Sequence, residues 1–179
     1  MKTQRAFIVI SVMLLHALFV QSAPAFALTH QDFTVMMRAI GFIGNPPSGD
    51  VTVAIIYDPS GQDSAAEARQ MQSELGSGYQ VGGMTLHPKL VPFSALGGMD
   101  GAPIAFIAAG TGSAQAEVAK KARAQKTLTL SLDKGCVVRG NCILYVNTAN
   151  RVEIVVNKAS AETSGISFKP TFMVLVTVI

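Results

Sequence analysis

The sequence predicts an α/β fold: a single three-layer Rossmann-like domain with a mostly parallel sheet, a C-terminal β-hairpin and a closing helix. Residues 50–57 and 102–109 are apolar almost throughout and rich in β-branched residues, which is typical of strands buried on both faces. A glycine-containing turn and a helical pattern follow each run. Alternating β and α segments of this kind form a parallel sheet covered by helices on both faces.

The first half of the chain supplies two helices and two strands of this pattern. Residues 29–43 predict a helix that Thr29 caps, because apolar side chains recur there at helical spacing. Residues 64–75 predict a second helix, with Ser64 and Glu67 as a capping box. We expect one strand over residues 79–86. The proline- and glycine-rich stretch 87–101 is expected to be irregular.

The second half predicts a helix over residues 113–125 and a strand over 128–132, followed by a β-hairpin of strands 143–147 and 151–156. In the second hairpin strand, alternation places Val152, Ile154 and Val156 on a buried face and their neighbours on a solvated one. The closing helix covers residues 158–164, with Asn157 as its N-cap and Gly165 at its C-terminal end.

The first 27 residues have the pattern of a secretory signal peptide. Lys2 and Arg5 precede an apolar centre over residues 6–20, and Ala25 and Ala27 form an A-x-A cleavage site. A retained membrane anchor would need about 20 apolar residues, and this run is shorter. We therefore expect cleavage after Ala27 and a periplasmic domain of residues 28–179.

The charge balance argues against a nucleic-acid-binding protein. Removal of residues 1–27 leaves 12 basic and 11 acidic side chains, against 14 and 11 in the full chain, and such a chain has no strong basic excess. One local basic cluster lies on or just after the helix predicted over 113–125. It is either a solvated helix face or an anion or lipid site, and consists of Lys120, Lys121, Arg123 and Lys126.

Cys136 and Cys142 are the only cysteines. In an exported protein two cysteines at this spacing predict a disulfide. Two interpretations stay open: a structural staple at the start of the hairpin, or a redox-responsive bond in a short exposed loop. A zinc site is not expected, because His30 and His87 are far from both cysteines in sequence.

Two loops at the carboxyl ends of predicted strands precede helices, which is where an open α/β sheet binds a small anion or other ligand. They are either ligand-binding loops or ordinary turns. A dinucleotide cofactor is not expected, because Gln115 stands where the third glycine of the fingerprint would be, and we predict no cofactor and no metal. The candidate residues are Asp58, Ser60 and Gly61 in the first loop, and Gly110, Thr111, Gly112 and Ser113 in the second.

No nucleophile or metalloprotease motif occurs in the sequence. It has no Gly-x-Ser-x-Gly or His-Glu-x-x-His pattern, and neither cysteine has a histidine nearby. We therefore do not expect an enzyme.

The region from the strand at 128 onward resembles the YfiR-like family of bacterial periplasmic proteins. Upstream, an Asp-Pro-x-Gly turn typical of the family stands at residues 58–61, whereas Gly44 to Pro47 replace the usual aromatic-Pro pair. The family pattern places a helix over residues 167–179, although their β-branched composition favours a strand. The matching segments are 127–131, 140–146, 151–157, Ala159, Ala161, 164–166 and Ser167.

This resemblance implies a regulator that binds the periplasmic part of an inner-membrane sensor, typically a diguanylate cyclase, and holds it inactive. Release would raise cyclic-di-GMP and promote biofilm formation, and the resemblance adds weight to a redox-responsive disulfide. A small ligand and a homodimer stay open. The alternative from another class is a periplasmic binding protein that delivers a small molecule to a transporter, because repeated β-α units and an export signal fit that class too.

Overall fold

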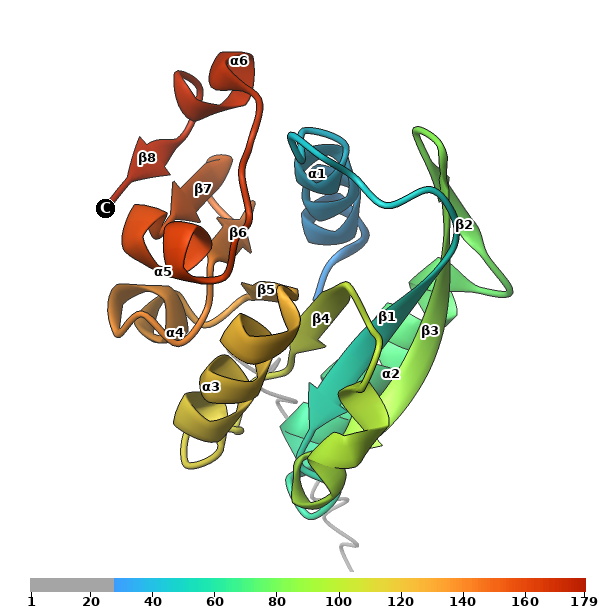
Figure 1. The fold of residues 1–179 in the computed structure, drawn as a ribbon. Coiled ribbons are helices and arrows are strands. Elements are labelled where there is room, and N and C mark those ends of the chain that lie inside the picture. Colours follow the sequence, from blue (N-terminus) through green and yellow to red (C-terminus); the bar gives the residue numbers. More distant parts are fainter. Residues whose placement is uncertain (1–27) are drawn as a thin grey trace, which may run out of the picture.

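Residues 28–179 are described by a computed structural model (Figure 1), and the predicted signal peptide lies outside the described residues. They form one α/β domain around an eight-stranded sheet of order β2-β3-β1-β4-β5-β6-β7-β8. Every neighbouring pair is parallel except β2 with β3 and β6 with β7. The predicted mostly parallel sheet is therefore confirmed.

The helices and strands follow the predicted order, with additions around the cysteines and in the tail. The first half contains α1 (His30–Ile40), β1 (Gly49–Tyr57), α2 (Gln62–Leu75), β2 (Tyr79–Val81), β3 (Met84–Pro92), the 3₁₀ helix η1 (Phe93–Met99), β4 (Ile104–Ile107), α3 (Gln115–Gln125) and β5 (Leu128–Ser131). The second half contains α4 (Lys134–Val138), β6 (Leu144–Asn147), β7 (Glu153–Val156), α5 (Lys158–Thr163), α6 (Pro170–Met173) and β8 (Thr177–Val178).

Two apolar clusters form the core, one on each face of the sheet. On one face the side chains of α1 and α2 pack against the strands, together with Ala161 of α5 and Phe172 of α6. On the other face η1, α3 and α4 pack against the alternate residues of β1 and β4. Because the central strands are covered on both sides, the three-layer prediction is confirmed.

The prediction of one strand over 79–86 and an irregular stretch over 87–101 is wrong. The double glycine turns the chain into a hairpin, and β3 then runs parallel to β1 over nine residues, from Met84 to Pro92. Pro88 and Pro92 in this strand are the reason that an irregular stretch was predicted here. They are tolerated because β2 covers only residues 84–86 of β3, which leaves a free edge where the missing N–H groups of Pro88 and Pro92 are not needed.

The cysteine segment and the hairpin also differ from expectation in detail. The cysteine loop contains α4, whose N-cap Asp133 accepts a hydrogen bond from the N–H of Gly135. The hairpin β6–β7 forms as predicted, but the single buried face does not. Val155 is buried against α4 on the face expected to be wet, and Val152 is exposed.

The tail contains both a helix and a strand, the two structures considered for it from the sequence. Pro170 begins the short helix α6 at its first position, and β8 then pairs with β7 in parallel. Phe172 is buried and anchors this segment, with ring centroids 5.2 Å from Phe42 and 5.3 Å from Phe168. Within residues 28–179 no helix combines the length and apolar character needed to cross a bilayer.

Candidate functional site

The two predicted ligand loops meet at the topological switch point of the sheet. The chain passes from β1 toward β3 on one side and from β4 toward β5 on the other, and β1 and β4 are neighbours. A Cβ placed on Gly110 would lie 3.6 Å from Cβ of Ser64, in the first turn of α2. The loops at 58–61 and 110–113 are therefore adjacent at the carboxyl ends of their strands, where open α/β sheets bind ligands.

The polar groups of these loops mostly bond to one another. Asp58 accepts hydrogen bonds from the N–H of Ser60 at 2.8 Å and from its hydroxyl at 2.6 Å, and these bonds hold the pKa of the Asp58 carboxyl below its ordinary value. In the second loop the buried Thr111 hydroxyl donates to the carbonyl of Ala108 at 2.7 Å. This is ordinary turn chemistry, so a ligand role for the loops stays a prediction.

Glu67 lies beneath these loops and was not predicted as a site residue. Only 3% of it is exposed; its Oε2 accepts from the N–H of Ala109 at 2.5 Å, and Oε1 has no hydrogen-bond partner among the described residues. Burial raises the pKa of Glu67 to about 8, and the charge of Asp32 adds to the shift. The Ser64–Glu67 capping box is therefore wrong: Ser64 instead accepts from the N–H of Asp58.

The disulfide between Cys136 and Cys142 forms, and both cysteines are fully buried. The loop between them exposes Val138 and Arg139, but the cysteines themselves are not accessible as the redox interpretation assumed. Residues at the start of α5 donate hydrogen bonds to carbonyl groups of this loop. Asn157 donates to the carbonyl of Val137 and Ser160 to that of Gly140, both at 2.9 Å. Because a reductant must reach sulfur, the burial of both cysteines favours the staple interpretation, and a redox-responsive role stays a prediction.

A row of exposed apolar side chains marks the outer edge of the sheet at β8. Val174 is 82% exposed and Leu175 is 74% exposed, although such residues are usually buried. A groove of about 350 Å³ runs between this tail and β7. Figure 1 shows β8 at the opposite end of the sheet from β2. The other members of this row, here named the C-terminal apolar edge, are Val152, Val178 and Ile179.

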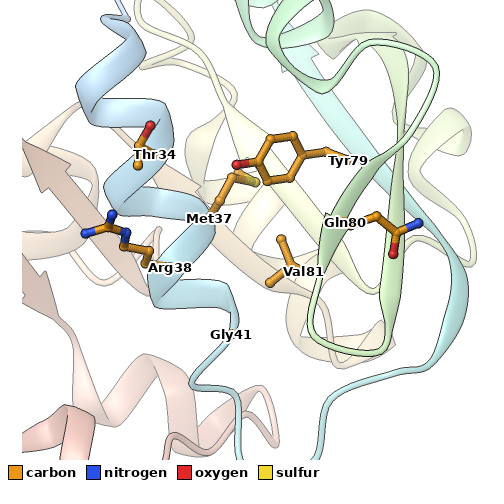
Figure 2. Close-up of a pocket in the computed structure, with 7 residues that line it drawn as sticks. All are labelled: Thr34, Met37, Arg38, Gly41, Tyr79, Gln80 and Val81. Carbon is orange, nitrogen blue, oxygen red and sulfur yellow. The ribbon is translucent and has the colours of Figure 1, made fainter.

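A second groove lies at the opposite edge of the sheet, between α1 and β2 (Figure 2), and has a volume of about 260 Å³. The ring of Tyr79 reaches toward Met37, whereas Arg38 extends away from the groove. Tyr79 also packs edge to face on the buried Phe33, with centroids 5.0 Å apart. The Tyr79 side chain on this edge is therefore already packed against side chains of α1.

Solved structures with the same fold include two described as binding proteins or as holding a ligand. A conserved domain protein from Vibrio cholerae has a TM-score of 0.60 at 14% identity, over 83% of this chain and 58% of that chain. An ABC domain in complex with L-Trp from Streptococcus pneumoniae has 0.56 at 15%, over 72% and 55%. CD0873, a substrate binding protein from Clostridium difficile, has 0.62 at 10%, over 86% and 60%. The chain spans less than two thirds of each, and these likenesses show the fold alone.

Sequence comparison gives a more specific result than structural comparison. No curated protein matches the chain. The model of the YfiR/HmsC-like family, in contrast, matches residues 35–176, which include every strand of the sheet except β8. Because this match covers most of the sequence, the chain belongs to the YfiR/HmsC-like family.

Proposed function

We propose that this protein is a periplasmic regulator that binds the periplasmic part of an inner-membrane diguanylate cyclase or related sensor and holds it inactive. Membership of the YfiR/HmsC-like family supports this class of function. The observation that carries the proposal is the C-terminal apolar edge, whose five side chains gather on one end of the sheet. Exposed apolar clusters of this kind are typical of protein interaction sites.

The geometry of this edge favours a protein partner over a small ligand. β8 contributes two residues to the sheet, and its outer side pairs with no described strand. The side chains of Leu175 and Val174 are largely exposed to solvent. The buried ring of Phe172 nevertheless anchors their segment to the domain. A fixed apolar surface loses little conformational entropy on association, so it suits a binding surface that is already formed.

The rim of the apolar edge is polar, as in most protein interfaces. Lys134 of α4 and Glu153 of β7 form an ion pair of 2.6 Å, and Arg151 is exposed beside Val152. We place the apolar side chains at the centre of the contact and these charges at its border. Rim charges of this kind set the association rate more than the affinity.

The proposal extends to control of the docked state by the envelope. The disulfide and Val155 of β7 belong to the same apolar cluster, so opening it would loosen the strand that supports β8. Release of the partner would then raise cyclic-di-GMP and favour biofilm formation. Control of this kind requires a prior opening that exposes sulfur, because both cysteines are buried.

Affinity capture from solubilised membranes of the source organism tests the docking surface. We expect the tagged wild-type chain to retain a sensor or cyclase, and Leu175→Lys to lose it, because a charge at an apolar contact is desolvated without a partner. Gln80→Lys introduces the same charge on β2 at the opposite edge and should retain the partner. Capture by Leu175→Lys at the wild-type level contradicts the proposal.

A transport-type binding protein is the second candidate, supported by the substrate binding protein among the structural neighbours. Transport receptors usually clamp a ligand between two lobes, whereas this chain spans 60% of that neighbour's length. A thermal-shift screen with amino acids and purines separates the two candidates. A large rise in melting temperature with one metabolite favours the binding protein, and a flat response favours the regulator.

A further inference from the structure

We propose that the partner binds by adding an extended segment of its own chain to the outer edge of β8, as a ninth strand of the sheet. This mode of docking rests on the regulator proposal and specifies the chemistry of the partner segment. β8 is the last strand in the order of the eight-stranded sheet, so one of its sides has no neighbouring strand (Figure 1). Unpaired N–H and C=O groups on such a side are a template for another strand.

The hydrogen bonds between β7 and the tail show which backbone groups face outward. Ile179 donates its N–H to the carbonyl of Val156 at 3.0 Å, and its own carbonyl accepts from the N–H of Lys158 at 2.9 Å. Ile179 therefore faces β7, and because backbone groups alternate in direction along a strand, the N–H and C=O of Val178 face the open side. Val176, just before β8, forms no backbone–backbone hydrogen bond within residues 28–179.

The side chains around this edge are apolar on both faces of the sheet. Residues 174–179 contain no charged residue, proline or glycine. Val178 is 41% exposed and Ile179 is 48% exposed, and as neighbours in an extended segment they project to opposite faces. A strand that covers both of them needs apolar side chains on both of its own faces. We therefore expect the partner segment to be a short run of β-branched and other apolar residues.

The opposite end of the sheet is blocked against the same kind of pairing. Met84 of β3 pairs with Val81 across a two-residue turn, so its N–H and C=O face outward toward β2. Outward positions recur at every second residue, and beyond the end of β2 they include Pro88 and Pro92. Proline has no N–H to donate, and it is one of the devices that protect sheet edges. The sheet is therefore open to strand addition at β8 and closed to it at β3.

A second copy of this chain is the other occupant that could supply a strand. β8 contributes only two residues to the sheet, so self-pairing joins a short stretch of each chain, whereas stable interfaces bury about 1,000 Å² or more. Two copies joined through β8 would also leave neither edge free for the partner. Self-pairing is therefore incompatible with the regulator proposal, and we assign the edge to the partner.

Isothermal titration of the purified protein with the periplasmic domain of the captured partner tests strand addition. Val178→Pro removes the outward N–H and introduces no charge, and proline is tolerated on edge strands where the N–H faces solvent. Val178→Ala is the matched control, because it shortens the same side chain and keeps the N–H. We expect Val178→Pro to bind at least about tenfold more weakly than Val178→Ala, because a carbonyl of the partner strand loses its donor.

Amide hydrogen exchange of the wild-type chain is a second measurement that depends on no variant. The Val178 amide should exchange more slowly in the complex than in the free protein, because it becomes hydrogen-bonded to the partner strand. The amide of the exposed Gln80 on β2 should exchange equally in both. The melting temperatures of Val178→Pro and Val178→Ala should agree, and if Val178→Pro fails to fold, the exchange of the wild-type amide decides.

Equal affinities of Val178→Pro and Val178→Ala overturn strand addition, and so does a Val178 amide that stays unprotected in the complex. A wild-type dimer in sedimentation that Val178→Pro converts to monomers assigns the edge to a second copy, which also overturns it. If Leu175→Lys loses the partner while Val178→Pro binds like Val178→Ala, strand addition fails and the regulator proposal stands. If Leu175→Lys and Val178→Pro both retain the partner, both proposals fail.

Discussion

The two edges of the sheet, at β2 and at β8, differ in the side chains that they expose. At one edge β2 is short, turns through a double glycine, and places the polar Gln80 between Tyr79 and Val81. Tyr79 there packs on Phe33 of α1. At the other edge β8 ends the sheet, and exposed valine, leucine and isoleucine side chains lie on and beside it. The first edge is protected against association, and the second is not.

This difference indicates that exposure at β8 serves a purpose. Natural proteins usually protect sheet edges with short strands, charges or a covering element, because an open edge promotes association with other chains. The β8 edge is short but otherwise unprotected, and its apolar side chains extend beyond the strand to Val174 and Leu175. A partner that covers this edge explains why an apolar tail is fixed to the domain and still left in water.

Phe172→Ala should have the largest effect and should separate the two edges most clearly. Phe172 is buried and stacks on Phe42 and Phe168, so truncation should cost about 3 kcal/mol of unfolding free energy. It should also weaken partner binding, because the ring anchors the apolar edge. Urea unfolding measures the first effect, and titration with the captured partner's periplasmic domain measures the second.

Tyr79→Ala is the matched change at the β2 edge. It removes an aromatic contact with Phe33 and should lower stability while partner affinity stays at the wild-type value. Equal losses of affinity in Tyr79→Ala and Phe172→Ala would show that global destabilisation, and not the β8 edge, controls binding.

The free energy of unfolding should depend on pH through Glu67, which lies beneath the loops at the carboxyl ends of the central strands. The pKa of Glu67 is raised to about 8 in the folded protein, against an ordinary value of 4.5, so the folded state binds more protons between these values. Stability should therefore be fully present below about pH 4.5 and fall as pH rises toward 8, by on the order of 3 kcal/mol. Urea unfolding at several pH values measures this dependence.

Glu67→Gln should remove most of that pH dependence, because an amide keeps the acceptor for the N–H of Ala109 and carries no charge. Partner binding through the apolar edge should be unaffected. A wild-type stability that rises steadily between pH 5 and 8 contradicts the assignment of Glu67 as a neutral, buried acid.

Removal of the disulfide should have a smaller effect that reaches the β8 edge only. The loop it closes is short, so Cys136→Ala with Cys142→Ala should cost about 2 kcal/mol of unfolding free energy in the chain-entropy model. Hydrogen exchange should increase in β7, whose Val155 belongs to the same apolar cluster as the cysteines, and in β8, which pairs with β7. It should stay unchanged in β2 and β3. Faster exchange at both edges alike would argue against a local staple.

The smallest expected effect is that of a charge at the protected edge. Gln80→Lys lies on an exposed position of β2, and surface changes of this kind usually alter stability by less than about 0.5 kcal/mol. Thermal unfolding and partner capture should both match the wild type. A loss of capture would move the docking surface from β8 to β2.

The central fold could be predicted because its strands have a distinctive local sequence pattern. The runs that became β1 and β4 are apolar on both faces, and a turn follows each one. β3 could not be predicted in the same way, since Pro88 and Pro92 are compatible with a strand only where the neighbouring strand has already ended. That condition depends on how far β2 extends, which is a tertiary property.

The candidate sites depended even more on tertiary structure. The pairing of Cys136 with Cys142 followed from their number and spacing, but their burial depends on packing against β7. Glu67 looked like a helix cap, because Ser64 stands three residues before it; its real partner, Ala109, is 42 residues away. The apolar character of the tail was evident, whereas its exposure was not, because composition alone does not distinguish a core strand from a docking edge.

The most direct test of the account is the cyclic-di-GMP content of cells that lack the native protein and express a variant in its place. Leu175→Lys should leave cyclic-di-GMP as high as in the deletion strain, although the variant accumulates and folds like the wild type. Gln80→Lys should restore the low wild-type content. Full repression by Leu175→Lys would contradict the claim that the C-terminal apolar edge is the surface through which this protein acts.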